Sequence, residues 1–200
     1  LGGCYIDFMS GRYKINPLEP KAWNTGQGDI DKDAPDAFNK ATRLSQHIAF
    51  LKDFFRAYKD FTDVQLDTIE ILLMKLYARF GITDSTDYSA KKPSDFPVMS
   101  DFYDILMAQP EDEAKDIALS LELFVNGSLN IFNHQTNVDV DNRFTVYGIR
   151  DLGTELSPIT MLVMMESIQN RIVENGKRGK ATWLYIDEFH VLLNSEYSAK

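Results

Sequence analysis

One short stretch near the end of the sequence constrains the fold more than any other. It is Thr182–His190, which opens with apolar and β-forming residues and then reaches two adjacent acids. A short apolar run of this kind, preceded by Gly179 and Lys180, is typical of a buried strand. Two unpaired carboxylates are too costly to bury in an apolar interior. Asp187 and Glu188 are therefore expected where this strand leaves the sheet.

In an open α/β sheet, ligands bind at the carboxyl ends of the strands. A strand that ends there in Asp-Glu has the form of a Walker B motif, which brings an Asp to Mg²⁺ beside the phosphates of a nucleotide. Asp187 would then be the metal ligand, and Glu188 would polarise the attacking water. The same two acids would also suit a helix that begins near Phe189, because acids are favoured at helix N-termini. The stretch alone leaves both interpretations open.

The composition excludes several classes of protein. The chain of 200 residues carries a net charge of −9, which argues against a nucleic-acid-binding surface. No apolar run is long enough to predict a transmembrane helix. A single cysteine, Cys4, excludes an internal disulfide framework and fits a reducing compartment. The sequence has neither an initiator Met nor a signal-peptide pattern, so we expect a fragment of a longer chain.

Between residues 36 and 125 the hydrophobic pattern is helical throughout. Apolar residues recur at intervals of three and four, and Thr62–Gln65 has the sequence of a capping box. The helix that this box starts is expected to stop at Gly81. Ser100 is expected to cap a further, short helix. His47 lies near the apolar stripe of the first helix and is predicted to be a core or boundary side chain.

An α/β pattern flanks this helical block on both sides. Residues 4–9 and 143–149 are predicted strands, and a helix is predicted from about Ser157, with Pro158 at its first position. Because the acidic stretch follows this helix, the second part has the order strand, helix, strand. That order is typical of a βαβ unit in a parallel sheet, and it favours the Walker B interpretation.

Several short motifs stand out along the chain: Ile15–Leu18, Phe124–Gly127, Phe132–Asp139, Tyr147–Leu152, Gly179–Thr182 and Asp187–His190. With these motifs the sequence resembles the conjugative type IV secretion ATPases, the VirB/TraC class, especially the form carried by conjugative transposons. The resemblance is strong over residues 124–195 and moderate over 1–18. Over the helices between, only the architecture is similar.

The resemblance implies a RecA-like parallel sheet, which is a truncated P-loop NTPase fold of the α/β class, interrupted by an all-α insertion. Residues 1–28 and 134–200 would form a partial ATPase core that carries the Walker B motif, and residues 29–133 would form the helical insertion. It also implies ATP and Mg²⁺ as cofactors, with Glu188 as the catalytic carboxylate and Asp187 as the magnesium ligand. His190 fits the pattern of the family without an assigned role.

The full-length protein would be a homo-hexameric motor at the cytoplasmic face of the membrane, associated with it only through other secretion components. Such a motor would energise conjugative DNA transfer. However, no Gly-x-x-x-x-Gly-Lys-Ser/Thr occurs in this chain, and that Walker A loop is what wraps the phosphates of a nucleotide. In the family the loop lies upstream of the first strand. We therefore expect the isolated chain to bind ATP poorly and not to hydrolyse it.

Other functions fit parts of the sequence. Asp187–His190 also fits the motif of DExH-type helicases, but those motors place compact βα units, rather than an all-helical block, before it. A second hypothesis is that the chain is a protein-interaction module. Its helices would then dock secretion partners, and the two acids would only cap a helix. A di-iron carboxylate site would need a second acid–His pair, and the sequence has none.

Overall fold

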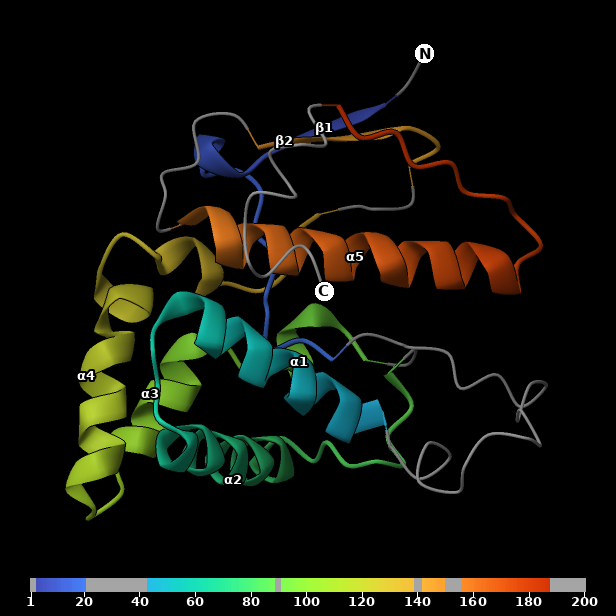
Figure 1. Ribbon diagram of the computed structural model, residues 1–200. Coiled ribbons are helices and arrows are strands. Elements are labelled where there is room, and N and C mark those ends of the chain that lie inside the picture. Colours follow the sequence, from blue (N-terminus) through green and yellow to red (C-terminus); the bar gives the residue numbers. More distant parts are fainter. Residues whose placement is uncertain (1–2, 21–42, 89–90, 139–141, 150–155, 188–200) are drawn as a thin grey trace.

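The computed structural model describes residues 3–20, 43–88, 91–138, 142–149 and 156–187. Within these residues, Figure 1 shows three layers: a small sheet, the long helix α5, and a block of helices α1–α4. The strands are β1 (Cys4–Asp7) and β2 (Thr145–Gly148), and the α-helices are α1 (Arg43–Tyr58), α2 (Asp63–Arg79), α3 (Met99–Met107), α4 (Asp112–Asn126) and α5 (Leu156–Lys177). Short 3₁₀ helices are η1 (Phe8–Ser10), η4 (Pro93–Asp95) and η5 (Asn130–Phe132). None of the helices described combines the length and apolarity that crossing a bilayer requires.

The two strands are parallel neighbours, although most of the chain separates them in sequence. Cys4 is aligned with Thr145, and Asp7 with Gly148. The parallel sheet and both strand positions were predicted, but both strands are shorter than predicted. The first ends early because the chain turns into η1 at Phe8. Its side chains alternate, as strand geometry requires.

One face of this sheet rests on α5 and the other is open. Ile6 is fully buried, whereas its neighbour Tyr5 is 57% exposed. Tyr147 is aligned with Ile6 and forms a hydrogen bond with Ser167 of α5. The helix predicted from about Ser157 is therefore confirmed as α5, and it covers the face of the sheet that holds Ile6.

The block of helices α1–α4 packs around a cluster of aromatic rings. Phe54 and Phe55 meet edge to face at 5.4 Å, and Phe54 also touches Phe124 and Phe132. Such pairs add about 0.5–1.5 kcal/mol each beyond their buried area. In the described residues from 43 to 138 the chain forms helices and no strand, as the spacing of its apolar residues at intervals of three and four predicted.

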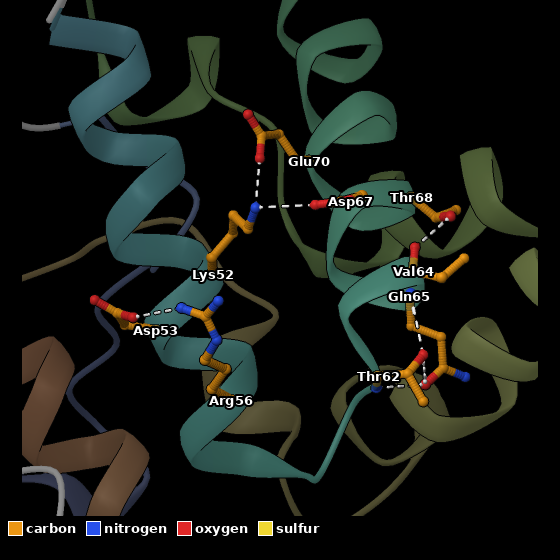
Figure 2. Close-up of polar contacts among 9 residues, drawn as sticks. All are labelled: Lys52, Asp53, Arg56, Thr62, Val64, Gln65, Asp67, Thr68 and Glu70. Carbon is orange, nitrogen blue, oxygen red and sulfur yellow. Dashed lines mark hydrogen bonds and ion pairs between the residues drawn. The ribbon is translucent and has the colours of Figure 1, made fainter.

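Figure 2 shows how α1 and α2 are held together and how α2 begins. The ammonium of Lys52 on α1 reaches Glu70 (2.6 Å) and Asp67 (3.3 Å) on α2, and the hydrogen bond to Glu70 is the main reason that the pKa of Lys52 is raised. The predicted capping box is confirmed: the Gln65 N–H donates to the Thr62 hydroxyl, and the Thr62 N–H donates to the Gln65 side chain.

Ser100, in contrast, does not cap α3. The cap is Val98, two residues earlier, so the helix begins at Met99, and the Val98 N–H donates to the carboxylate of Asp101 (2.8 Å). An acid in the first turn thus takes over the function of the cap. The Ser100 N–H instead donates to the side chain of Asn133 (2.8 Å), which belongs to a distant segment.

The chain enters and leaves the helical block through two adjacent segments, residues 12–18 and 133–138, which we call the neck. Asn137 Oδ1 accepts from the Lys14 N–H (2.7 Å), and Thr136 Oγ1 accepts from the Asn16 N–H (3.0 Å). The buried Asn16 side chain donates to the Pro97 carbonyl (2.8 Å) and accepts from the Leu18 N–H (3.0 Å). The polar motif residues Asn16 and Thr136–Asn137 therefore satisfy backbone groups at this crossing.

Candidate functional site

The acidic stretch begins in a turn at the end of α5. The Lys180 N–H donates to the Asn175 carbonyl (2.8 Å), which reverses the chain. Gly179 lies at φ +66°, a left-handed conformation that glycine adopts without a steric penalty. The side chain of Asn175 also donates to the Thr182 hydroxyl (2.9 Å). The first residues of the stretch are thus tied to the last turns of α5, and Figure 1 shows the chain running back from there along the molecule.

Residues 181–187 form no regular secondary structure and are exposed, rather than forming a buried strand. Trp183 is 80% exposed and Tyr185 is 86% exposed. The prediction that Leu184–Ile186 lies in one sheet with Cys4–Met9 is therefore wrong for this structure. A strand needs a neighbour that pairs with its N–H and C=O groups, and the sheet that the structure describes contains only β1 and β2. The sequence specified an extended conformation here but not a partner.

Asp187 is the last described residue of the stretch, and its side chain is exposed. Its carboxylate suits a hard cation such as Mg²⁺, which prefers oxygen ligands. Glu188 and His190 lie outside the described residues. The catalytic role expected of Glu188 therefore stays a prediction, and His190 has no assigned role. In the part of the chain that the structure describes, no three His, Cys, Asp or Glu side chains gather as metal ligands.

A second acid, Asp7, lies at the carboxyl end of β1 and was not selected from the sequence. It is aligned with Gly148 at the end of β2, so both strands end at the same edge of the sheet. Ser10 donates its hydroxyl hydrogen to the Asp7 carbonyl (2.6 Å), which stabilises the turn that follows. A repeat in the sequence would have revealed this acid, because Tyr5–Asp7 reads Tyr-Ile-Asp, as Tyr185–Asp187 does.

An open cavity of about 560 Å³ lies along β1 and the turn after it. The cavity is lined by Gly3, Cys4, Tyr5, Asp7, Ser10, Arg12, Tyr13 and Asn142. Asp187 does not line it, so the cavity and the acidic stretch are separate features of this structure.

Tyr147 joins the sheet to α5 on the side away from the open face. Burial raises the pKa of its phenol, although the hydrogen bond with Ser167 and the nearby Arg171 act in the opposite direction. The phenol therefore stays neutral at physiological pH. The contact fixes β2 on the same helix that carries the acidic stretch at its far end.

Comparison with known proteins identifies this fold. No protein-family profile matches the sequence, and no curated protein matches it. Among solved structures, that of VirB4 of Thermoanaerobacter pseudethanolicus is similar, with a TM-score of 0.71 and 21% sequence identity. The match covers 85% of this chain and 43% of the VirB4 chain, so the chain spans less than half the length of that structure. The resemblance inferred from the motifs is thus confirmed at the level of the fold.

Proposed function

We propose that the chain is part of an ATPase of the VirB/TraC class and that Asp187 and Glu188 belong to its hydrolysis site. One combination supports this: a fold shared with VirB4 over 85% of the chain, and an Asp-Glu pair that ends the stretch after α5. A motif alone has a high false-positive rate, and a fold alone hosts many functions. Residues 1–28 and 134–200 would form the RecA-like core, and 29–133 the helical insertion.

The chemistry follows from the two acids. Asp187 would hold Mg²⁺, whose charge neutralises the charge that develops on the transferred phosphoryl group. Glu188 would orient the attacking water and accept its proton. Because the chain has no Walker A loop, the contacts to the phosphates of ATP must come from other parts of the full-length protein. That protein would act as a hexameric motor, with other secretion components, at the cytoplasmic face of the membrane and would energise conjugative DNA transfer.

The decisive experiment replaces each acid in a chain extended to include the Walker A loop. Glu188→Gln keeps the shape of the side chain but removes the base, so turnover should fall by about 10²–10⁴-fold while ATP binding remains. Asp187→Asn should weaken Mg²⁺-dependent ATP binding as well. ATPase rate, nucleotide affinity and melting temperature are measured on the same preparations.

The alternative role of the acids gives a different result. If they only cap a helix, both amides should preserve turnover and lower stability by at most about 0.5–2 kcal/mol. Normal turnover in Glu188→Gln would show that the catalytic assignment is wrong.

The 200-residue chain itself provides a second test. Calorimetric titration with ATP and Mg²⁺ should show little binding, because the Walker A loop supplies most phosphate contacts. Micromolar affinity for ATP would contradict the proposal that this chain carries only half of the site.

A further inference from the structure

His47 and Glu166 are buried, ionisable side chains that meet between the helical block and α5. His47, on α1, is 0% exposed, and Glu166, on α5, is 5% exposed. The distance from His47 Nδ1 to Glu166 Oε1 is 3.5 Å. Within the described residues, neither of these atoms makes a hydrogen bond, and His47 Nε2 makes none either. Buried polar groups without partners are costly, so simple packing does not account for this contact.

Among the described residues, the only ion-pair contact of either group is the one that His47 and Glu166 make with each other. The ring of Phe50 on α1 stacks on His47, and Tyr77 of α2 meets its edge, each with ring centres 5.9 Å apart. The Tyr77 hydroxyl already donates to the Leu18 carbonyl (2.9 Å). Burial raises the pKa of Tyr77 and the negative charge of Glu166 raises it further, so this phenol stays neutral. His47 is thus the ionisable side chain that faces the carboxyl group of Glu166.

We propose that His47 and Glu166 form a buried polar pair that positions α5, and with it the acidic stretch, relative to the helical block. This inference rests on the proposed function, because the acidic stretch is the proposed hydrolysis site. Both are positioning residues, since they act on Asp187 through α5. Glu166 and Asn175 both lie on α5, and the Asn175 side chain donates a hydrogen bond to the Thr182 hydroxyl at the start of the stretch. The pair is thus connected to the stretch through one helix.

A buried polar pair performs this task better than apolar side chains of the same size. Apolar replacements of buried pairs are often at least as stable, so stability does not explain why these two polar groups are there. Two buried polar groups that can only contact each other, however, permit one relative position of the helices that carry them. Apolar surfaces tolerate sliding. The His47–Glu166 pair therefore selects one register between α1 and α5.

A double-mutant cycle in the intact chain tests the pair. His47→Phe and Glu166→Leu each leave one polar group buried without its partner, so each should shift the unfolding equilibrium by about a hundredfold or more toward the unfolded state. The double variant removes both groups and should be more stable than either single variant. Glu166→Gln keeps the size of the side chain and serves where Glu166→Leu does not fold. If the losses of stability in the two single variants simply add in the double variant, the two side chains do not interact and the proposed pair is wrong.

Hydrogen exchange tests the positioning of α5. His47→Phe and Glu166→Gln should speed exchange along α5 and in the turn from Asn175 to Thr182. Lys52→Met is the matched control, because it removes the ion pair with Glu70 that joins α1 to α2 and does not involve α5. Equal exchange in α5 for the control and for His47→Phe would overturn the positioning role.

Activity in the chain extended with the Walker A loop connects the pair to the hydrolysis site. The single variants should lower kcat by up to about a hundredfold, the usual effect of a small misplacement of a catalytic group. The KM for ATP should change little, and the double variant should recover part of kcat. An unchanged kcat would overturn the link to hydrolysis. An inactive parent would instead contradict the proposed function and would leave the stability cycle valid.

Discussion

At the scale of single residues, Asn137 makes the neck specific. Its Oδ1 accepts from the Lys14 N–H (2.7 Å), its Nδ2 donates to the Arg12 carbonyl (2.8 Å), and its own N–H donates to the Lys14 carbonyl (3.1 Å). A side-chain amide is both donor and acceptor. One side chain thus pairs with both kinds of backbone group on a segment that is remote in sequence.

Replacing this amide tests the neck directly. Asn137→Asp keeps the acceptor but loses the donor to Arg12, so it should destabilise the chain by about 0.5–1.5 kcal/mol, the net value of one hydrogen bond. Urea unfolding monitored by circular dichroism gives this value. Asn126→Ala is the control, because the exposed Asn126 side chain donates along its own helix, to Glu122 (2.6 Å), and alanine brings no like charge to that contact. Equal losses in both variants would contradict a special role for the neck.

His134 gives the neck a pH dependence. Burial lowers the pKa of His134, and the nearby charge of Lys14 lowers it further. Because its pKa in the folded state lies below the unfolded value of 6.5, the folded state disfavours protonation. Its contribution to stability is therefore fully present above the unfolded pKa and is lost as the pH falls toward the folded pKa. In His134→Gln, the melting temperature should fall less on acidification than in the parent chain, and an unchanged slope would contradict this.

The tripeptide Tyr-Ile-Asp occurs twice, at Tyr5–Asp7 and at Tyr185–Asp187, and it shows how far the local sequence predicts the environment of a residue. In β1 it pairs with β2, and Ile6 is fully buried. In the acidic stretch it has no paired strand among the described residues, and Ile186 remains 38% exposed. Identical residues thus take different environments, because a strand is completed by a distant neighbour and not by its own sequence.

At the scale of secondary-structure elements, α2 was predictable because its signals are local. The Thr62–Gln65 box and the glycine at 81 act within one helical turn of each end. The start of α3 was mispredicted, because Ser100 and Asp101 both suit a helix start and the contact with Asn133 decided between them. That contact joins distant parts of the sequence, so no local pattern reveals it.

The capping box should contribute measurably to stability. Thr62→Ala removes the acceptor for the Gln65 N–H and should cost about 1 kcal/mol. Thr68→Ala is a matched control on the same helix, because its hydroxyl only bonds back to the Val64 carbonyl (2.9 Å), and it should stay within about 0.5 kcal/mol of the parent. Thermal unfolding compares the two, and equal effects would show that the box contributes nothing.

Two glycines at helix ends should respond in opposite directions to alanine. At Gly127 a Cβ would lie 2.8 Å from the backbone Cα of Leu123, which cannot move aside, so Gly127→Ala should destabilise by about 1–3 kcal/mol. At Gly176 in α5 a Cβ meets nothing within 4 Å, so Gly176→Ala should stabilise by about 0.5–1 kcal/mol. Chemical denaturation measures both, and a shared sign would contradict the steric argument.

At the scale of the whole molecule, the periodicity of the sequence predicted most elements but not how they stack. Helical periods predicted the block, and the strand–helix pattern predicted β2 and α5, whereas the strand expected after α5 is not formed in the described residues. The open face of the sheet was not predictable, because parallel sheets usually have both faces covered. Tyr5, Phe144 and Val146 are exposed in this chain, at 57%, 63% and 38%. If the chain belongs to a larger ATPase core, other parts of that core should cover this face.

Trp183 reports whether the sheet is completed in the longer protein. It is 80% exposed here, so its fluorescence in this chain should resemble that of tryptophan in water. In a chain extended to include the Walker A loop, a paired strand would bury it and shift the emission to shorter wavelength. Trp23→Phe leaves Trp183 as the sole tryptophan of the 200-residue chain, and in the extended chain the spectrum of Trp183 is obtained as the difference from a Trp183→Phe variant. Identical Trp183 spectra in the two chains would contradict completion of the sheet.

The neck has a consequence for how such proteins can diverge. Because the chain enters and leaves the helical block at the same place, the block is a side branch in the path of the chain, and the order of strands does not depend on its length. Substitutions, insertions and deletions on its outer surface should accumulate over evolution without disturbing the sheet. The inner surface differs, since α1 contributes to the burial of α5. Divergent relatives should therefore vary in the outer helices while retaining the neck and the surface that faces α5.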